Sequence, residues 1–356
     1  MTLYLDCAAH MPMNEAALKA FVDYNNSTAG HGNALAPSTP GRSAAIAIEN
    51  AREKIASLLG AKSANQIVFT STATQACEWA VSTLKQLDCG VICISPTEHP
   101  AVRQAANKYF PETTEIKIDK NGVIQKTKFN YYESVICTHV QNEIGIIQPI
   151  DNIKCRYLFS DMSQSCGKIT INLSNLSIDL ATFSAHKFGG PASIGLIYLK
   201  DTNYWKEFGT GSRYYLDRPG TMDVASIVAT AAALELAVNT LPERTQKMQE
   251  FKTILENGLE EMDFKIIAKD AARSPSTTFV RLGPEKGFTT MMALDEKGIY
   301  VSLGSACGAA HTGKSPLMAK LGINGGAHDF IRISQFGQYG ENEAKLFINT
   351  LKDIYA

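Results

Sequence analysis

Residues 180–191 read LATFSAHKFGGP, and this stretch is the best guide to the fold. Its first four residues form an apolar run typical of a buried strand, and Ser184-Ala185-His186-Lys187 follows at once. Lys187 therefore lies at the end of a buried strand, just before a Gly-Gly-Pro turn, where a fully solvated charge is out of place. A buried amine has a lowered pKa and is a good nucleophile for forming a Schiff base. A single lysine is far more often a surface residue, so the interpretation depends on its neighbours.

Strand-like and helix-like segments alternate on both sides of this stretch. Strands are expected at 66–70, 90–95, 134–138, 156–160, 179–183 and 194–199. Helices are expected at 43–59, 73–87, 223–260, 286–297 and after Glu341, and Pro242 should divide the third of these. The alternation predicts an α/β fold with a mainly parallel sheet flanked by helices.

The length of the chain predicts two domains. With 356 residues, 45% of them hydrophobic, it can bury a large core. We place a large domain at residues 12–250. The pattern of short strands beyond about 262 predicts a smaller α+β domain, made of residues 1–11 and 251–356.

Composition excludes several classes of protein. The formal net charge is −1 with no block of Lys or Arg, so neither nucleic acid nor an acidic membrane surface is an expected partner. The first residues lack the basic and apolar regions of a signal peptide. Eight cysteines stand at uneven spacings, mostly in apolar runs, which is typical of small buried side chains in a reducing compartment. We therefore expect a soluble, cytoplasmic protein without a metal site.

Two further motifs follow predicted strands and suit a phosphorylated ring. Small hydroxyl residues at 70–74 (TSTAT) begin a helix, whose free N–H groups attract phosphate, although Thr72 acting as an ordinary N-cap is the simpler interpretation. Asp161 could keep a pyridine nitrogen protonated, and Gln164 could bind a ring oxygen. An Asp that caps the next helix is an equally good explanation of Asp161.

Two more candidates are a histidine, which could stack on a ring, and an arginine, which could bind an anion. His99, in Thr97-Glu98-His99-Pro100, could stack on a cofactor ring and move protons, although a satisfied half-buried histidine is the commoner case. Arg332, in the middle of Phe330–Ser334, could clamp a carboxylate with two hydrogen bonds or form a structural ion pair. Together, these groups are what an amino-acid enzyme that uses pyridoxal 5'-phosphate (PLP) requires.

The order and spelling of these motifs resemble the cysteine desulfurases, in the class V aminotransferase branch of the PLP fold-type I enzymes. The resemblance runs from Leu3-Tyr4-Leu5-Asp6 to Ile331-Arg332-Ile333-Ser334. Other matching stretches are Gly32-Asn33, 67–71 (IVFTS), 97–99 (TEH), 142–145 (NEIG), Asp161 through Gln164-Ser165, 184–187 (SAHK) and 218–221 (RPGT). Cys307 lies in a small-residue stretch, Gly304-Ser305-Ala306-Cys307, and aligns with the family's persulfide cysteine. Its spacing to Gly322 resembles the long-loop subgroup.

The resemblance implies a role for each of these residues. The catalytic residues implied are Cys307, Lys187 and His99, with Lys187 forming the Schiff base. The implied cofactor-binding residues are Asp161 at the pyridine nitrogen, Gln164 and Asn142 at the ring side, His99 stacked on the ring, and Ala73, Thr74, Ser184 and His186 at the phosphate. Thr221 is implied to reach the phosphate from the partner subunit of a homodimer, and Arg332, Asn33 and Asn142 to bind the substrate.

The resemblance also implies a reaction. The enzyme would remove sulfur from L-cysteine, releasing L-alanine and leaving a persulfide on Cys307 for an acceptor protein. Selenocysteine lyase or another class V reaction is the alternative, and a non-catalytic scaffold is a third possibility. The acceptor is left open among iron–sulfur assembly, tRNA thiolation and DNA sulfur modification. Departures from the family pattern at Thr72, Glu78 and 34–38 affect the entrance and not the core groups.

Overall fold

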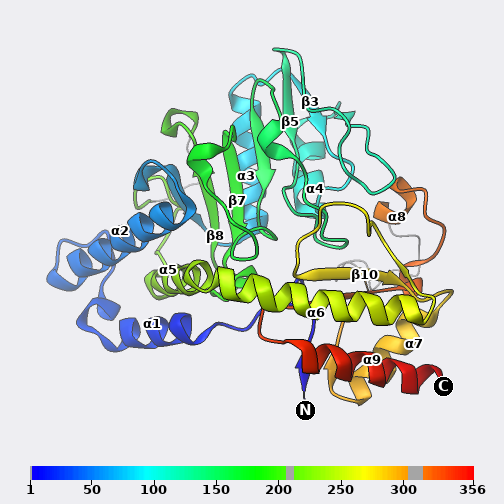
Figure 1. Cartoon of the computed structure of the whole chain (residues 1–356). Helices are drawn as coiled ribbons and strands as arrows, with labels where there is room; N and C mark the ends of the chain where they lie inside the picture. Colours follow the sequence, from blue (N-terminus) through cyan, green and yellow to red (C-terminus); the bar gives the residue numbers. More distant parts are fainter. Residues whose placement is uncertain (1, 206–211, 304–315) are drawn as a thin grey trace.

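A computed structural model describes residues 2–205, 212–303 and 316–356. Its main feature is a seven-stranded sheet (Figure 1). In spatial order the strands are β2 (Ile67–Thr70), β8 (Gly195–Leu199), β7 (Leu180–Ser184), β6 (Leu158–Asp161), β5 (Glu133–Ile136), β3 (Val91–Ile94) and β4 (Thr114–Glu115). All neighbours from β7 to β4 pair in parallel, and β8 is antiparallel to both of its neighbours. The prediction of an α/β fold with a mainly parallel sheet is confirmed.

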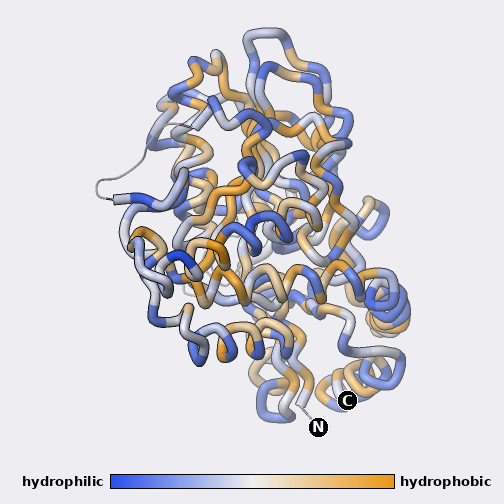
Figure 2. The backbone as a smooth tube through the Cα atoms, turned by 90° about the vertical axis from the view of Figure 1, so that its left-hand side faces the viewer, coloured by the Kyte–Doolittle hydropathy of each residue, from blue (hydrophilic) through white to orange (hydrophobic). Residues whose placement is uncertain are grey.

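Helices cover both faces of this sheet because its strands are apolar on both sides. Successive residues of a strand point to opposite faces, so Val135 packs in one hydrophobic cluster and Ile136 in the other. The first cluster includes α1 (Glu15–Asn26), α2 (Thr39–Leu59) and α5 (Val224–Asn239); the second includes α3 (Ala73–Gln86) and α4 (Pro100–Tyr109). Figure 2 shows the hydrophobic segments gathered inside and the hydrophilic ones at the periphery.

Most of the remaining elements lie below the large sheet in Figure 1, and α8 lies to its right. They are α6 (Leu241–Glu261), α7 (Lys286–Glu296), α8 (Pro316–Lys320), α9 (Glu341–Tyr355), an antiparallel sheet of β12 (Phe330–Ser334), β10 (Thr277–Arg281) and β9 (Lys265–Ile266), and a parallel pair of β1 (Leu3–Tyr4) and β11 (Ile299–Tyr300). Residues from β1, α6, α9 and these strands share a third hydrophobic cluster. The predicted boundaries of two domains stay a prediction.

Most predicted elements lie within a few residues of their expected bounds. The break expected at Pro242 is confirmed, since α5 ends at Asn239 and α6 begins at Leu241 with Pro242 in its first turn. Helix α1 was not predicted from the sequence. No single helix in the described part of the chain is long and apolar enough to cross a membrane, although α5 and α6, bent by 66°, pass that test as a pair.

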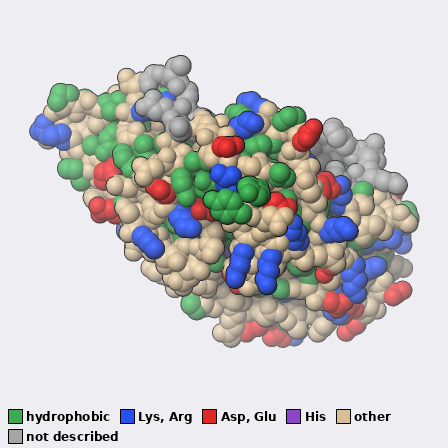
Figure 3. Space-filling view, turned by 90° about the horizontal axis from the view of Figure 1, so that it is seen from above, with side chains coloured by type: hydrophobic (Ala, Val, Ile, Leu, Met, Phe, Trp, Pro, Cys, Tyr) green, Lys and Arg blue, Asp and Glu red, His purple; other side chains and the backbone are tan. Residues whose placement is uncertain are grey.

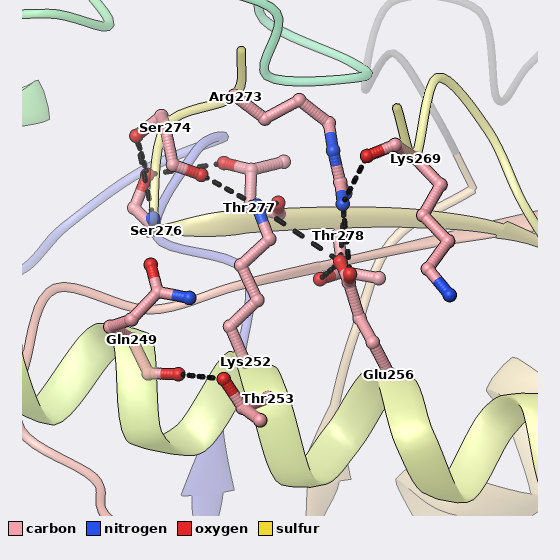
Figure 4. Close-up of polar contacts among 10 residues, drawn as sticks. All are labelled: Gln249, Lys252, Thr253, Glu256, Lys269, Arg273, Ser274, Ser276, Thr277 and Thr278. Atoms are coloured by element: carbon pink, nitrogen blue, oxygen red, sulfur yellow. Dashed lines mark hydrogen bonds and ion pairs between the residues drawn. The ribbon is translucent and has the colours of Figure 1, made fainter. Parts of the chain in front are cut away.

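A buried polar cluster fastens α6 to β10 (Figure 4). The Nζ of Lys252 donates to the carbonyl oxygens of Ser274 at 2.8 Å and Thr277 at 3.0 Å. Glu256 accepts two hydrogen bonds from Arg273, at 2.7 and 2.8 Å. Burial lowers the pKa of Lys252 to about 7. The segment that carries Ser274 also pairs with the chain after Asn142, because Ser274 N–H donates to Gly145 O.

The end of the large sheet where β5 and β6 begin carries exposed aromatic side chains. Tyr131 and Tyr132 are 76% and 69% exposed. The Arg156 guanidinium lies 5.8 Å from the centre of the Tyr131 ring and 5.7 Å from that of Tyr157. Figure 3, a view from above, shows basic and acidic side chains interspersed around hydrophobic ones on this side of the molecule. This side therefore carries mixed charge and not a field of one sign.

Candidate active site

One edge of the large sheet collects the ends of most of its strands. Strands β2 and β7 are both antiparallel to β8, so β2, β3, β5, β6 and β7 all run the same way. Side chains that follow parallel strands meet at their carboxyl edge, where ligands bind in open α/β sheets. A pocket of about 240 Å³ lies at this edge. It is lined by Ala8, Ala9, Ala73, Thr74, Cys77, His99, Ala101, Thr138, Val140, Asn142, Asp161, Ser163, Gln164, Ser184, His186, Lys187 and Arg332.

Most of the site residues predicted from the sequence are among these lining residues. Asn33 and Thr221 are not; both are exposed, and Asn33 accepts a hydrogen bond from the Leu35 N–H. Cys307 lies outside the described residues. The pocket therefore brings the predicted cofactor-binding groups together, apart from Thr221, with Arg332 from the other sheet.

Lys187 stands in a 3-10 turn that follows β7 directly. Its Nζ donates to the carbonyl oxygen of Ala8 at 2.8 Å and to that of Ala9. The turn after it requires a glycine, because Gly189 has a φ of +87° and a Cβ there would meet Asn14 at 3.0 Å. The sequence therefore fixes the Lys187 amine at the pocket wall, against the N-terminal segment.

Asp161 ends β6 and is buried at the pocket. Its Oδ1 accepts from the Ser163 N–H at 3.0 Å, from Ser163 Oγ at 2.7 Å and from Thr182 Oγ1 at 3.4 Å. These three donors hold the carboxylate in place through one oxygen. Among the described residues, none donates a hydrogen bond to the other oxygen, Oδ2.

His186 is a neutral ring at physiological pH. Burial, with the nearby positive charge of Lys187 next in size, lowers its pKa to about 3. Its Nδ1 lies 3.1 Å from Ser184 Oγ, and its ring stacks on His10 with centroids 5.3 Å apart. A neutral imidazole offers one N–H donor and one acceptor, so Ser184 and His186 form a polar pair without charge.

His99 also serves the local structure. Its Nδ1 accepts a hydrogen bond from the Ala101 N–H at 3.2 Å, which caps α4. A nitrogen that accepts carries no proton, so the proton of the neutral ring is on Nε2, and burial lowers the pKa of His99. Thr72 likewise caps α3 through the Gln75 N–H at 3.1 Å, as the simpler interpretation predicted. The capped α3 presents Ala73 and Thr74 to the pocket.

Arg332 forms the structural ion pair that its sequence left open, and its role as a substrate clamp stays a prediction. It lines the pocket, and its side chain is nearly buried. Its Nη2 forms an ion pair with Asp6 Oδ1 at 2.8 Å, and its Nη1 donates to the Asn142 carbonyl at 3.1 Å. Its buried Nε has no hydrogen-bond partner among the described residues. The guanidinium is thus oriented by protein groups and still reaches the pocket.

Known proteins that are similar to this chain indicate the family to which it belongs. A family model described as Aminotransferase class-V matches residues 3–344. A cysteine desulfurase IscS of Buchnera aphidicola is 33% identical over 93% of this chain and 87% of its own length. The chain belongs to the cysteine desulfurase family of class V aminotransferases. An IscS of Haemophilus influenzae is 31% identical over 99% of this chain and 92% of its own. A solved NifS-like protein matches with a TM-score of 0.90 and 27% identity, covering 100% of this chain and 99% of that one.

Several residues of this family member's pocket region were missed from the sequence. Cys77 is buried in the second hydrophobic cluster and also lines the pocket, with its Sγ 3.5 Å from Thr182 Oγ1. Lys168 lies in the turn after β6 and is 1% exposed. Glu98 is 7% exposed and its Oε2 has no hydrogen-bond partner among the described residues. The position of Glu98, a polar residue shortly after a predicted strand, could have indicated that it lies near the pocket. The sequence around Lys168, which follows Gly167, gives no such indication.

The buried Glu98 carboxyl should make stability depend on pH. Burial raises its pKa from 4.5 to about 8, against the effect of the Thr138 N–H, which donates to Oε1 at 2.6 Å. Between pH 4.5 and 8 the unfolded chain releases this proton while the folded chain keeps it, so this group lowers the free energy of unfolding as pH rises. Glu98→Gln should therefore stabilise the protein by a few kcal/mol at pH 8, since each pKa unit corresponds to about 1.4 kcal/mol, and by much less near pH 5.

Thermal unfolding at pH 5 and pH 8 measures this difference. Glu133→Gln is the control, because the Asn130 N–H and Lys126 lower the pKa of that carboxyl, so its loss should act in the opposite direction. A gain for Glu98→Gln that is equal at both pH values would show that Glu98 is ionised in the folded protein.

Proposed function

We propose that this protein is a PLP-dependent cysteine desulfurase that acts on L-cysteine. The observation that carries the proposal is the pocket itself. It places an amine, a carboxylate held by three donors, a neutral Ser–His pair and a helix N-terminus around one cavity, with a buried arginine at its side. The family's relatives provide independent support.

The pocket residues fit PLP. Asp161 Oδ2 is available to a protonated pyridine nitrogen, and His99 supplies a flat ring beside it. The N-terminus of α3 at Ala73 and Thr74 suits the phosphate, since helix N-termini bind anions. We assign the remaining phosphate contacts to Ser184 and His186, and the ring-side contacts to Gln164 and Asn142.

The residues of the chain divide the work. When bound, PLP supplies an aldehyde that captures amines and a ring that withdraws electrons. Lys187 Nζ attaches the cofactor and then takes the Cα proton of the substrate. Asp161 Oδ2 holds the ring nitrogen protonated. Arg332, with Asn142 and Asn33, binds the substrate carboxylate.

The sulfur leaves through Cys307. Its thiolate attacks the sulfur of L-cysteine, so an S–S bond forms as the substrate's C–S bond breaks. The carbon that loses sulfur takes a proton and leaves as L-alanine, and Cys307 keeps a persulfide for an acceptor protein.

We propose a cytoplasmic location, in accord with the free state of the seven described cysteines.

Product analysis tests this function. With L-cysteine and a thiol reductant, the purified protein should give alanine and sulfide in equal amounts. A keto acid in place of alanine would identify a transaminase. Turnover of selenocysteine but not of cysteine would identify a selenocysteine lyase, the alternative activity.

Arg332→Lys should raise the KM for L-cysteine about 10- to 100-fold and leave the spectrum of bound PLP unchanged. A bidentate guanidinium–carboxylate contact is worth about 1.5–3 kcal/mol, and a lysine cannot form the bidentate pair. Steady-state kinetics measures this effect. Asp6→Asn is the control, since it removes the ion pair at 2.8 Å but keeps the guanidinium. An unchanged KM for Arg332→Lys would place the substrate carboxylate elsewhere.

We also propose a homodimer in which Thr221 completes the phosphate site of the partner subunit. Thr221 is exposed and outside its own pocket, and the Arg218 guanidinium donates to its carbonyl oxygen at 2.9 Å. Thr221→Ala should speed the loss of PLP about tenfold, the effect of one hydrogen bond, and leave the melting temperature of the cofactor-free protein unchanged. Light scattering that found an active, PLP-saturated monomer would contradict the dimer.

A further inference from the structure

The turn after β6 contains a buried lysine that the proposed reaction does not use. Lys168 is 1% exposed and does not line the pocket. Its Nζ donates to Gln164 Oε1 at 2.5 Å, and Gln164 does line the pocket. Lys168 therefore stands behind a predicted cofactor-binding residue, at the side away from the cavity.

The contacts of Gln164 settle which way its amide points. With Oε1 bound to Lys168, its Nε2 donates to the carbonyl oxygen of Ala8 at 2.8 Å. The same carbonyl accepts from Lys187 Nζ, also at 2.8 Å. A chain of hydrogen bonds thus runs from Lys168 through Gln164 to the Ala8 carbonyl that holds Lys187.

A glutamine amide has two ends of nearly equal shape, so its neighbours must determine its orientation. An ammonium has only donors and no acceptor, so it accepts no bond from the NH₂ end and selects the oxygen. The NH₂ group then faces the Ala8 side, where one of its hydrogens is used. Its second hydrogen remains for an acceptor in the pocket.

We propose that Lys168 is a positioning residue that fixes the Gln164 amide, so that Nε2 presents its free hydrogen to an oxygen on the ring of PLP. This inference rests on the proposed function, because it names PLP as the ligand. Burial lowers the pKa of Lys168 to about 7, with Lys187 the next cause. The orienting effect therefore belongs to the charged form, since a neutral amine has a lone pair and can accept as well as donate.

Lys168→Met removes the donor and preserves most of the volume. It should weaken binding of PLP about tenfold, the effect of one hydrogen bond, and shift the absorbance maximum of the bound cofactor. Equilibrium titration of the cofactor-free protein with PLP measures the first effect. Loss of a buried ammonium also changes stability, so a control of the same kind is needed.

Lys252→Met is that control. Lys252 is likewise buried with a pKa lowered to about 7. It donates to the backbone carbonyls of Ser274 and Thr277 and lies 4.0 Å from the Glu256 carboxylate, and none of these residues lines the pocket. It should change the melting temperature of the cofactor-free protein without changing PLP affinity or the spectrum. If Lys168→Met behaves in the same way, its role is structural and the proposal is wrong.

A double-mutant cycle identifies the route of the effect. If Lys168 acts through Gln164, then Lys168→Met added to Gln164→Leu should cause no further loss of PLP affinity. Additive losses would overturn the proposal. Should Lys168→Met not fold, Lys168→Gln offers a shorter polar side chain, and the same cycle applies to it.

The wild-type titration separates the two levels of inference. Wild-type protein that binds PLP with Lys168→Met binding it equally well would remove the positioning role alone. Wild-type protein that does not bind PLP would overturn the proposed function, and the positioning role with it.

Discussion

Lys187→Ala should bind PLP only reversibly and lose alanine production by about 10³-fold or more, because the proposed mechanism gives one amine two tasks. It attaches the cofactor, and it takes the Cα proton of the substrate, a proton transfer that alone contributes about 10²- to 10⁴-fold. The position supports both tasks, since Nζ lies in the pocket wall and is held by the Ala8 carbonyl at 2.8 Å. Borohydride reduction followed by peptide mapping checks the attachment.

The position of the reduced adduct tests which lysine attaches the cofactor. Lys168 is also buried beside the pocket, so a reduced adduct on Lys168 would overturn the assignment to Lys187. Wild-type protein treated with borohydride should carry the cofactor on the peptide that contains residues 184–190. The Lys187→Ala protein, treated in the same way, should carry none. An added primary amine should restore part of its activity by accepting the proton.

The large sheet was predictable because its strands follow simple rules. A continuous apolar run such as 180–183, bounded by turn residues, is typical of a strand buried on both faces. The rule that parallel strands end at one edge then places their polar residues together. Asp161, His99 and Lys187 are far apart in the sequence, yet they line one pocket for this reason.

Helix α1 was less predictable. Few of its apolar side chains are buried: Ala17 and Tyr24 are, while Leu18 and Val22 are 50% and 45% exposed. Its place is set by packing against α5, more than 200 residues away in the sequence. No local pattern records such a contact.

Buried polar groups were missed for a related reason. Lys168 and Glu98 look like ordinary charged residues, and their burial follows from elements that meet only in the folded chain. Arg332 was left between a substrate clamp and an ion pair, and it has both the ion pair with Asp6 and a place in the pocket. The sequence can indicate that a residue is a candidate for a site, but which side chain it contacts is decided only when the chain folds.

Cys307→Ser should bind PLP as tightly as the wild type and fail to form a persulfide. Alanine production should fall by about 10³-fold or more, because a hydroxyl at this position is a far weaker nucleophile toward sulfur than a thiolate. Mass spectrometry of the protein after exposure to L-cysteine measures the persulfide as the mass of one added sulfur atom. The PLP spectrum before and after substrate shows that the earlier steps are intact.

The other cysteines argue for this residue by their surroundings. Attack on sulfur needs a thiolate. Burial raises the pKa of every described cysteine above its usual value: Cys7, Cys77, Cys89, Cys93, Cys137, Cys155 and Cys166. A neutral thiol at each of these positions is a poor acceptor for the sulfur of the substrate.

Cys93→Ala and Cys137→Ala are therefore the matched controls, and each should cost only packing. Cys77→Ala is not a clean control because Cys77 lines the pocket. If Cys307→Ser keeps the wild-type rate of alanine production with thiol reductant present, sulfur does not pass through this residue. The selenocysteine lyase activity, whose chemistry can proceed without such a cysteine, would then be the better assignment.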